Sequence, residues 1–206
     1  MPDTEFPGTN SPGDRKVERK RMRQARSAFV GALAAQTRHA LQSAACAALL
    51  PHLGPPAVLA SYAAVGDELD PSTAERAAQA LGWRIVFPRA SPGAPLSFHA
   101  VPRDRLTPGR LGIPEPGPDS PQARPDVLLV PLIAADRAGN RLGQGGGFYD
   151  RSLAALRASG PVMAIGLAWD IQIVDHVPAE PWDQPIDAIA TPSAFHLAGP
   201  GARGEG

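Results

Sequence analysis

The sequence predicts an α/β protein, built as a single three-layer domain with a central, mostly parallel sheet flanked by helices. Short apolar runs of strand length alternate with amphipathic helical patterns, which is typical of sheets whose strands are connected by helices. The chain of 206 residues is also long enough to bury one substantial core, and no internal repeat is visible in it.

Two helices are expected before the first strand. Asp14 is a suitable N-cap for a basic helix over residues 14–30. A second helix, rich in Ala and Leu, is expected over residues 32–50, and Pro51 would end it. The pattern then alternates, with strands expected over residues 57–65, 83–87 and 95–101 and a helix over residues 71–81.

Residues 126–133 give the strongest strand prediction, because a continuous apolar run follows an acidic start. The Pro- and Gly-rich residues 102–125 before it are expected to form a long irregular connection. The elements expected after it are a helix over residues 148–158 and strands over residues 162–168 and 188–191. Residues 1–13 and 198–206 are expected to be disordered tails, which leaves residues 14–197 as the folded domain.

The composition excludes several classes of protein. Lys and Arg number 20, as do Asp and Glu, so the net charge is zero and a general binder of nucleic acid or anionic membranes is not expected. The only cysteine, Cys46, allows no internal disulfide and fits a reducing compartment. The chain begins without a secretory signal and has no apolar run of membrane-spanning length, so a cytoplasmic protein is expected, acting as a monomer.

The segment from Arg141 to Asp150 carries the clearest functional signal. Four of the five residues from 143 to 147 are glycines, which let backbone N–H groups approach a phosphate, and a helix start would add partial positive charge. The loop matches neither the Walker nor the dinucleotide fingerprint. A flexible hairpin or linker would give the same run, but it would not need Arg141, Tyr149 and Asp150 around it. The position of the loop after the strongest strand also favours a nucleotide site.

Other charged groups are open to two interpretations. Arg15 and Arg19 lie one turn apart on the basic helix and could clamp a polyphosphate; a solvated helix face and RNA binding are the alternatives. Glu68 follows a strand and could face a ligand or lie exposed. Asp150 and Asp183 could share a magnesium ion, although the sequence gives no distance between them.

The residues from Val127 to Tyr149 closely resemble the 5-formyltetrahydrofolate cyclo-ligase family, also called 5,10-methenyltetrahydrofolate synthetases. The resemblance runs from about Arg15 to Phe195 and includes the blocks Gly112–Pro116, Gly166–Gln172, Pro178–Asp183 and Thr191–Ser193. It implies a ring closure that uses ATP and Mg²⁺ to turn 5-formyltetrahydrofolate into 5,10-methenyltetrahydrofolate, releasing ADP and phosphate. In that reaction the formyl oxygen takes the γ-phosphoryl group, N10 attacks the activated carbon, and phosphate leaves.

The resemblance also implies a role for each matching residue. Arg141 and Tyr149 would be catalytic, and Asp150 and Asp183 would bind Mg²⁺. The ATP contacts would be Arg15, Lys16, Arg19, Arg141, Leu142, Gly143, Gln144, Gly145, Gly146, Gly147, Phe148 and Tyr149. The folate contacts would be Ala63, Glu68, Gln144, Gly145, Gly146, Gly147 and Phe148. The family often has a basic residue at position 144 or 146, where this chain has Gln144 and Gly146, so Arg141 and backbone N–H groups would matter more here.

Two other functions are compatible with the same residues. One is an ATP-dependent kinase or ligase that acts on another small acid. The other is a non-enzymatic protein that binds folate or RNA through the basic helix.

Overall fold

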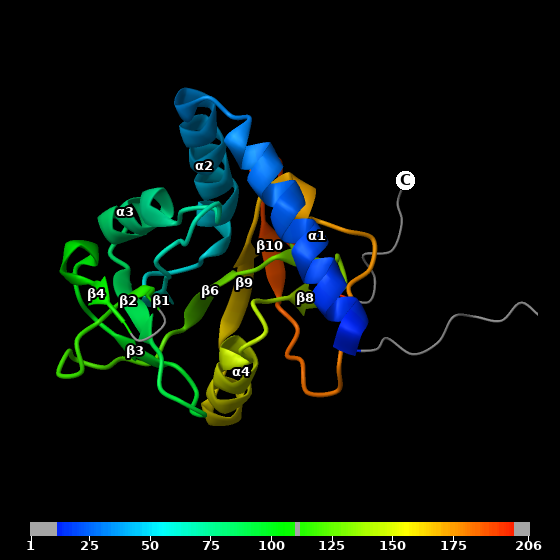
Figure 1. Cartoon of the computed structure of the whole chain (residues 1–206). Helices are drawn as coiled ribbons and strands as arrows, with labels where there is room; N and C mark the ends of the chain where they lie inside the picture. The colour runs from blue at the N-terminus through cyan, green and yellow to red at the C-terminus, as the bar shows by residue number, and fades with distance from the viewer. Residues whose placement is uncertain (1–11, 110–111, 200–206) are drawn as a thin grey trace, which may run out of the picture.

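The computed structural model describes residues 12–109 and 112–199 (Figure 1). The helices are α1 (Pro12–Gly31), α2 (Ala35–Leu49), α3 (Ser72–Ala80) and α4 (Phe148–Ser159), with short 3₁₀ turns η1 (Leu50–His52), η2 (Arg103–Arg105) and η3 (Asp170–Gln172). The predicted tails fall largely outside the described residues, although Pro12 already begins α1. Within those residues, no helix is both long and apolar enough to cross a bilayer.

A seven-stranded sheet forms the centre of the molecule. Its strands, in spatial order, are β11 (Phe195–Leu197), β10 (Ala188–Ala190), β9 (Met163–Leu167), β6 (Val127–Pro131), β1 (Val58–Ala60), β2 (Arg84–Arg89) and β3 (Ser97–His99). Neighbouring strands from β10 to β2 are parallel, and the two edge strands β3 and β11 pair antiparallel. This arrangement confirms the predicted α/β class.

The helices cover both faces of the sheet. Side chains along β6 point alternately to one face and to the other, so both faces need a packing partner. Val127 and Leu129 pack in one core cluster with Ala45 and Leu49 of α2 and with residues of α3. Leu128 and Val130 pack in a second cluster, which includes Leu153 of α4. β6 is therefore apolar on both faces, which is why it was the clearest strand in the sequence. Figure 1 shows α4 well apart from α2 and α3.

Two of the sheet strands, β1 and β6, end earlier than predicted, whereas β2 continues to Arg89 rather than ending at residue 87. The first strand ends at Ala60 rather than at residue 65. Pro131 ends β6 because proline has no N–H for the ladder. The chain then forms a small hairpin of β7 (Ala134–Ala135) and β8 (Arg141–Leu142), whose turn is held by the Asp136 carboxylate.

The connection over residues 102–125 was expected to be irregular, but part of it has regular structure. It contains η2 and a hairpin of β4 (Thr107–Pro108) and β5 (Pro114–Glu115). Arg89 of β2 forms an ion pair of 3.1 Å with Glu115, and the Ala90 N–H donates to the same carboxylate. These contacts hold the hairpin against the end of β2, where a sequence dense in Pro and Gly gave no strand signal.

Candidate functional site

A cavity of about 600 Å³ lies beyond the carboxyl ends of β1 and β6. These two strands are neighbours, but β1 leads to β2 on one side while β6 leads to β9 on the other. In open α/β sheets, ligands bind where the strand order reverses in this way. The cavity is therefore placed where the fold itself leaves a crevice.

Most of the predicted site residues line this one cavity, although they come from distant parts of the chain. Those that line it are Arg15, Arg19, Ala63, Glu68, Arg141, Gly143, Gln144, Gly145, Gly146, Gly147, Phe148, Tyr149, Asp150 and Asp183. Two do not. Lys16 is exposed on α1, and Leu142 is fully buried in a small cluster with Met22 and Ile133.

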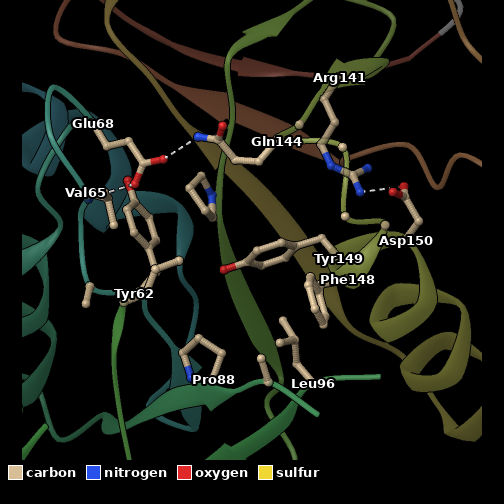
Figure 2. A pocket seen from close by; sticks show the side chains of 18 of the residues that line it. Tyr62, Val65, Glu68, Pro88, Leu96, Arg141, Gln144, Phe148, Tyr149 and Asp150 are labelled. Atoms are coloured by element: carbon tan, nitrogen blue, oxygen red, sulfur yellow. Dashed lines mark hydrogen bonds and ion pairs between the residues drawn. The ribbon is translucent and has the colours of Figure 1, made fainter. Parts of the chain in front are cut away.

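Figure 2 shows that the lining separates into two parts. Arg141 and Asp150 lie on one side, and Glu68 and Tyr62 lie on the other, with Gln144 and Tyr149 between them. We call the first part the charged end, which comprises Arg15, Arg19, Arg141, Asp150 and Asp183. We call the second part the tyrosine side, which comprises Tyr62, Val65, Glu68 and Pro88.

The glycine-rich loop has a backbone that requires glycine. Gly145 and Gly147 have φ values of +98° and +64°, which L side chains rarely adopt. A Cβ on Gly146 would lie 2.9 Å from the ring of Phe148, and one on Gly147 would lie 2.8 Å from Arg151 Nη1. Gly147 is the N-cap of α4 and offers no side-chain cap, so the first N–H groups of the helix remain available to an anion.

Gly147→Ala should therefore disturb the loop more than a neighbouring substitution does. The left-handed backbone costs an alanine about 1–2 kcal/mol, and Arg151, which donates to the Gly146 carbonyl, must move. We expect a lower midpoint of chemical denaturation for Gly147→Ala. Gly143→Ala is the matched control for stability, because its φ is not positive and its Cβ would meet nothing within 4 Å. Equal midpoints for the two variants would contradict this account of the loop.

Three arginines converge on the charged end. Arg15 Nη1 donates to Asp183 at 2.8 Å, and Arg19 Nε donates to the Gly143 carbonyl at 3.0 Å. Arg141 Nη2 donates to Asp150 at 2.6 Å. Burial and the neighbouring guanidinium groups of Arg15 and Arg23 lower the pKa of Arg19. Arg141 is paired with Asp150, and Arg15 with Asp183 and, at 4.0 Å, with Glu180, so the three guanidinium groups bring together donors that suit a polyanionic ligand.

The two aspartates are brought to the same end by one backbone contact. Asp150 Oδ1 accepts hydrogen bonds from Arg141 and from the Gln184 N–H, and Gln184 directly follows Asp183. Asp183 Oδ2 accepts from Arg15 and from the Glu180 N–H. Within the described parts of the chain, the second oxygen of each carboxylate makes no hydrogen bond. Each aspartate thus has one oxygen free for a cation.

The tyrosine side combines a buried carboxylate with the neutral phenol of Tyr62, and the neutral phenol of Tyr149 lies next to it. Glu68 is 6% exposed, and it accepts from the Val65 N–H at 3.0 Å and from Gln144 Nε2 at 3.1 Å. Burial, and secondly the negative charge of Glu68, raise the pKa of both Tyr62 and Tyr149 well above the usual value. Both hydroxyls therefore stay protonated. The Tyr62 hydroxyl donates to the Leu69 carbonyl, whereas Figure 2 shows the Tyr149 hydroxyl pointing into the cavity.

Several lining residues could not be identified from the sequence. Tyr62, Pro88, Leu96, Ile113 and Trp182 come from different segments, and each alone is an ordinary apolar residue. Three of them lie in segments that the sequence does single out: Tyr62 begins the segment that contains Glu68, and Ile113 and Trp182 belong to the blocks Gly112–Pro116 and Pro178–Asp183 that resemble the family. The others become recognisable only when the fold brings their segments to one cavity.

Comparisons with known proteins give one consistent result. The sequence model of the 5-formyltetrahydrofolate cyclo-ligase family matches residues 12–192. The protein named 5-formyltetrahydrofolate cyclo-ligase in Escherichia coli strain K12 is 39% identical over 150 residues, which cover 68% of this chain and 82% of that protein. Its namesake in Mycolicibacterium smegmatis is 37% identical over 121 residues, 54% of this chain and 61% of that protein.

Solved structures support the fold. A 5,10-methenyltetrahydrofolate synthetase from Aquifex aeolicus superposes with a TM-score of 0.70 at 23% identity, covering 93% of this chain and 96% of that one. The synthetase from Mycoplasma pneumoniae gives a TM-score of 0.65 at 23% identity, covering 87% of this chain and 99% of that one. At this level of identity the likeness concerns the fold.

Proposed function

The chain belongs to the 5-formyltetrahydrofolate cyclo-ligase family, and from this premise we propose that it uses ATP and Mg²⁺ to convert 5-formyltetrahydrofolate to 5,10-methenyltetrahydrofolate, releasing ADP and phosphate. One observation carries the proposal beyond family membership. A single cavity joins an arginine- and aspartate-lined end, suited to a triphosphate, to a side with a buried carboxylate and aromatic walls, suited to a pterin. Both reactants can therefore meet in it.

The chemistry needs activation because a formyl oxygen is a poor leaving group. In the proposed reaction this oxygen attacks the γ-phosphorus and ADP departs. The lone pair of N10 then attacks the formyl carbon, the C–O bond breaks, and inorganic phosphate leaves with the former formyl oxygen while N10 loses its proton. The protein mainly has to align the two substrates and neutralise the charge that develops.

The charged end would hold the triphosphate. Arg15 and Arg19 lie one turn apart on α1 and approach it from one side, while Arg141 approaches from β8. The uncapped N-terminus of α4 and the loop from Gly143 to Gly147 would add backbone N–H donors. Gln144 and Gly146 supply no positive charge, so Arg141 would carry the larger share of charge stabilisation. Lys16 is exposed and would act only from a distance.

Asp150 and Asp183 fit a magnesium ion. Mg²⁺ prefers oxygen ligands, and at nucleotide sites it commonly takes one or two carboxylates with phosphate oxygens and water. Each aspartate has one oxygen without a hydrogen bond in the described chain, on the same side of the cavity as the arginines. When bound, the ion would neutralise charge on the phosphates during transfer.

Asp150→Asn should raise the concentration of Mg²⁺ needed for half-maximal turnover and lower the turnover number. The amide keeps the size of the carboxylate and can still accept from the Gln184 N–H, but it has no charge for the ion. We expect about a tenfold shift in the magnesium dependence. The measurement is turnover against total Mg²⁺ at fixed ATP. A magnesium curve that matches that of the unmodified protein would show that Asp150 is not a ligand.

The tyrosine side would hold the folate. Glu68 offers acceptor oxygens for the N–H groups of a pterin, and Gln144 now uses one of these oxygens. Pro88, Leu96 and Tyr62 offer apolar surface for the rings, with Ala63 beside them. Gln144 also accepts a hydrogen bond from Arg23 at 2.6 Å, so its side chain links α1 to Glu68. The bond from Gln144 to Glu68 would have to break when the pterin binds.

We also propose that residues 14–197 form the catalytic domain, and that the enzyme works as a cytoplasmic monomer without a nucleic-acid or membrane partner. The basic face of α1 supports the absence of a nucleic-acid partner, because Arg15 is bonded to Asp183 and Arg19 and Arg23 are bonded to the glycine-rich loop rather than to solvent alone.

The proposal is tested by mixing the purified chain with 5-formyltetrahydrofolate, ATP and Mg²⁺. We expect absorbance growth from the methenyl product, with one ADP released for each product molecule, and no reaction when any component is omitted. ADP release with another small acid but not with the folate would favour a kinase or ligase of different specificity. Salt-sensitive RNA binding without any ATP chemistry would favour a binding protein.

A further inference from the structure

Trp182 is a large apolar side chain at the charged end of the cavity, where its neighbours are charged. Its exposed fraction is 68%, and it lines the cavity together with Arg15, Asp183 and Asp150. The other exposed large hydrophobic residues that line the cavity, Val65 and Ile113, come from the loop after β1 and the β4–β5 hairpin. An indole left in water beside a cluster of arginines has no structural role in packing the core.

The backbone around Trp182 is held in a hydrogen-bonded turn. The Asp183 N–H donates to the Glu180 carbonyl and the Glu180 N–H donates to Asp183 Oδ2, both at 2.9 Å, so the turn is closed from both ends. Beyond it, the Gln184 N–H is bonded to Asp150 and its carbonyl accepts from Arg141. Figure 1 shows this segment in orange beside the first turns of α1, in agreement with the Arg15–Asp183 ion pair.

We propose that Trp182 is a stacking platform for the purine base of the nucleoside triphosphate. The inference rests on the proposed use of ATP and adds the residue that holds the base. A nucleotide whose phosphates occupy the arginines of the charged end must place its flat, apolar end nearby, and Trp182 is the aromatic side chain that the structure presents there on a hydrogen-bonded turn. Stacking on an indole recognises the π-face common to all bases, so it would give affinity rather than selectivity between purines.

Kinetics of two substitutions test this assignment. Trp182→Ala should raise the KM for ATP by about 5- to 100-fold, since removal of an aromatic platform costs a stacked base an amount of this order. The KM for the folate should stay within about twofold, and Trp182→Phe should recover most of the affinity for ATP. Leu197→Ala is the matched control, because Leu197 is 69% exposed and lies on β11 away from the cavity.

Fluorescence gives a second reading that does not need turnover. Trp182 is the exposed tryptophan of the three, since Trp83 and Trp169 are 5% and 0% exposed. Titration with ATP and Mg²⁺ should quench its emission, and Trp182→Phe should abolish the change. Inorganic tripolyphosphate has no base, so its own inhibition constant against ATP should be the same in the unmodified protein and in Trp182→Ala.

The outcomes separate the inference from the proposed function. An unchanged KM for ATP in Trp182→Ala, or a rise confined to the KM for the folate, would overturn the stacking role while leaving the cyclo-ligase reaction in place. Absence of folate turnover in the unmodified chain would instead overturn the proposed function, and the ATP titration would still decide whether the base meets Trp182.

Discussion

Arg141→Ala should lower the turnover number by about 10²- to 10³-fold while leaving the chain folded. The Arg141 side chain is 4% exposed, yet it lines the cavity and holds Asp150 at 2.6 Å. Its guanidinium is therefore fixed in place before any ligand arrives. A preorganised cation of this kind stabilises a transferring phosphoryl group more than the ground state does, so the loss should appear mainly in kcat.

The folded state should tolerate this substitution better than its burial suggests. Asp150 is 24% exposed at its side chain and keeps the hydrogen bond from the Gln184 N–H, so water and the backbone can replace part of the lost contact. The turnover number of Arg141→Lys should lie between those of the unmodified chain and Arg141→Ala, because lysine keeps the charge but not the forked geometry. The measurements are steady-state kinetics and a thermal melt. Arg137→Ala, on the exposed turn between β7 and β8, is the control. A kcat for Arg141→Ala close to that of this control would remove Arg141 from the mechanism.

Arg103→Ala should have the largest effect on stability, lowering the free energy of unfolding by about 3 kcal/mol or more. Arg103 donates through two nitrogens to the Glu75 carboxylate, whose side chain is 5% exposed. It also donates to the Tyr62 carbonyl at 2.9 Å. Removing it leaves a buried carboxylate with the Ser61 hydroxyl as its remaining donor in the described chain, and an uncompensated buried charge is costly.

A second substitution separates lost charge balance from lost packing. Glu75→Gln in the Arg103→Ala background should recover most of the stability, because a neutral amide no longer needs a cation and can still accept from Ser61. Denaturant unfolding of the unmodified chain, both single variants and the double variant gives the coupling. Additive losses in the double variant would show that Arg103 and Glu75 stabilise the fold independently.

The sequence was sufficient to predict the layers of this fold. The run from Val127 to Pro131 is apolar on both faces because it lies between α2 and α4, and a continuous apolar strand of this kind belongs to a parallel sheet with helices on both sides. The elements that it did not predict are short and held by tertiary contacts. β5 depends on the Arg89–Glu115 ion pair, and β11 pairs with β10 at the edge of the sheet.

The candidate site was predicted where local chemistry is unusual and missed where it depends on the fold. Glycines at 145 and 147 mark a backbone that other residues avoid, so the loop could be recognised from the chain alone. The ion pair of Arg15 with Asp183 joins residues 168 positions apart in the sequence, and no local sequence pattern can predict a contact over that separation. The same holds for Trp182: it belongs to the block Pro178–Asp183, but the sequence does not show that this turn lies beside α1.

The most direct test of the central claim is a crystal structure of the chain with 5-formyltetrahydrofolate, Mg²⁺ and a non-hydrolysable ATP analogue. The account predicts the γ-phosphate beside Arg141 and Asp150, the pterin against Glu68, and the formyl oxygen between them in the cavity beyond β1 and β6. Either ligand bound at a different cleft, with this cavity left empty, would contradict it.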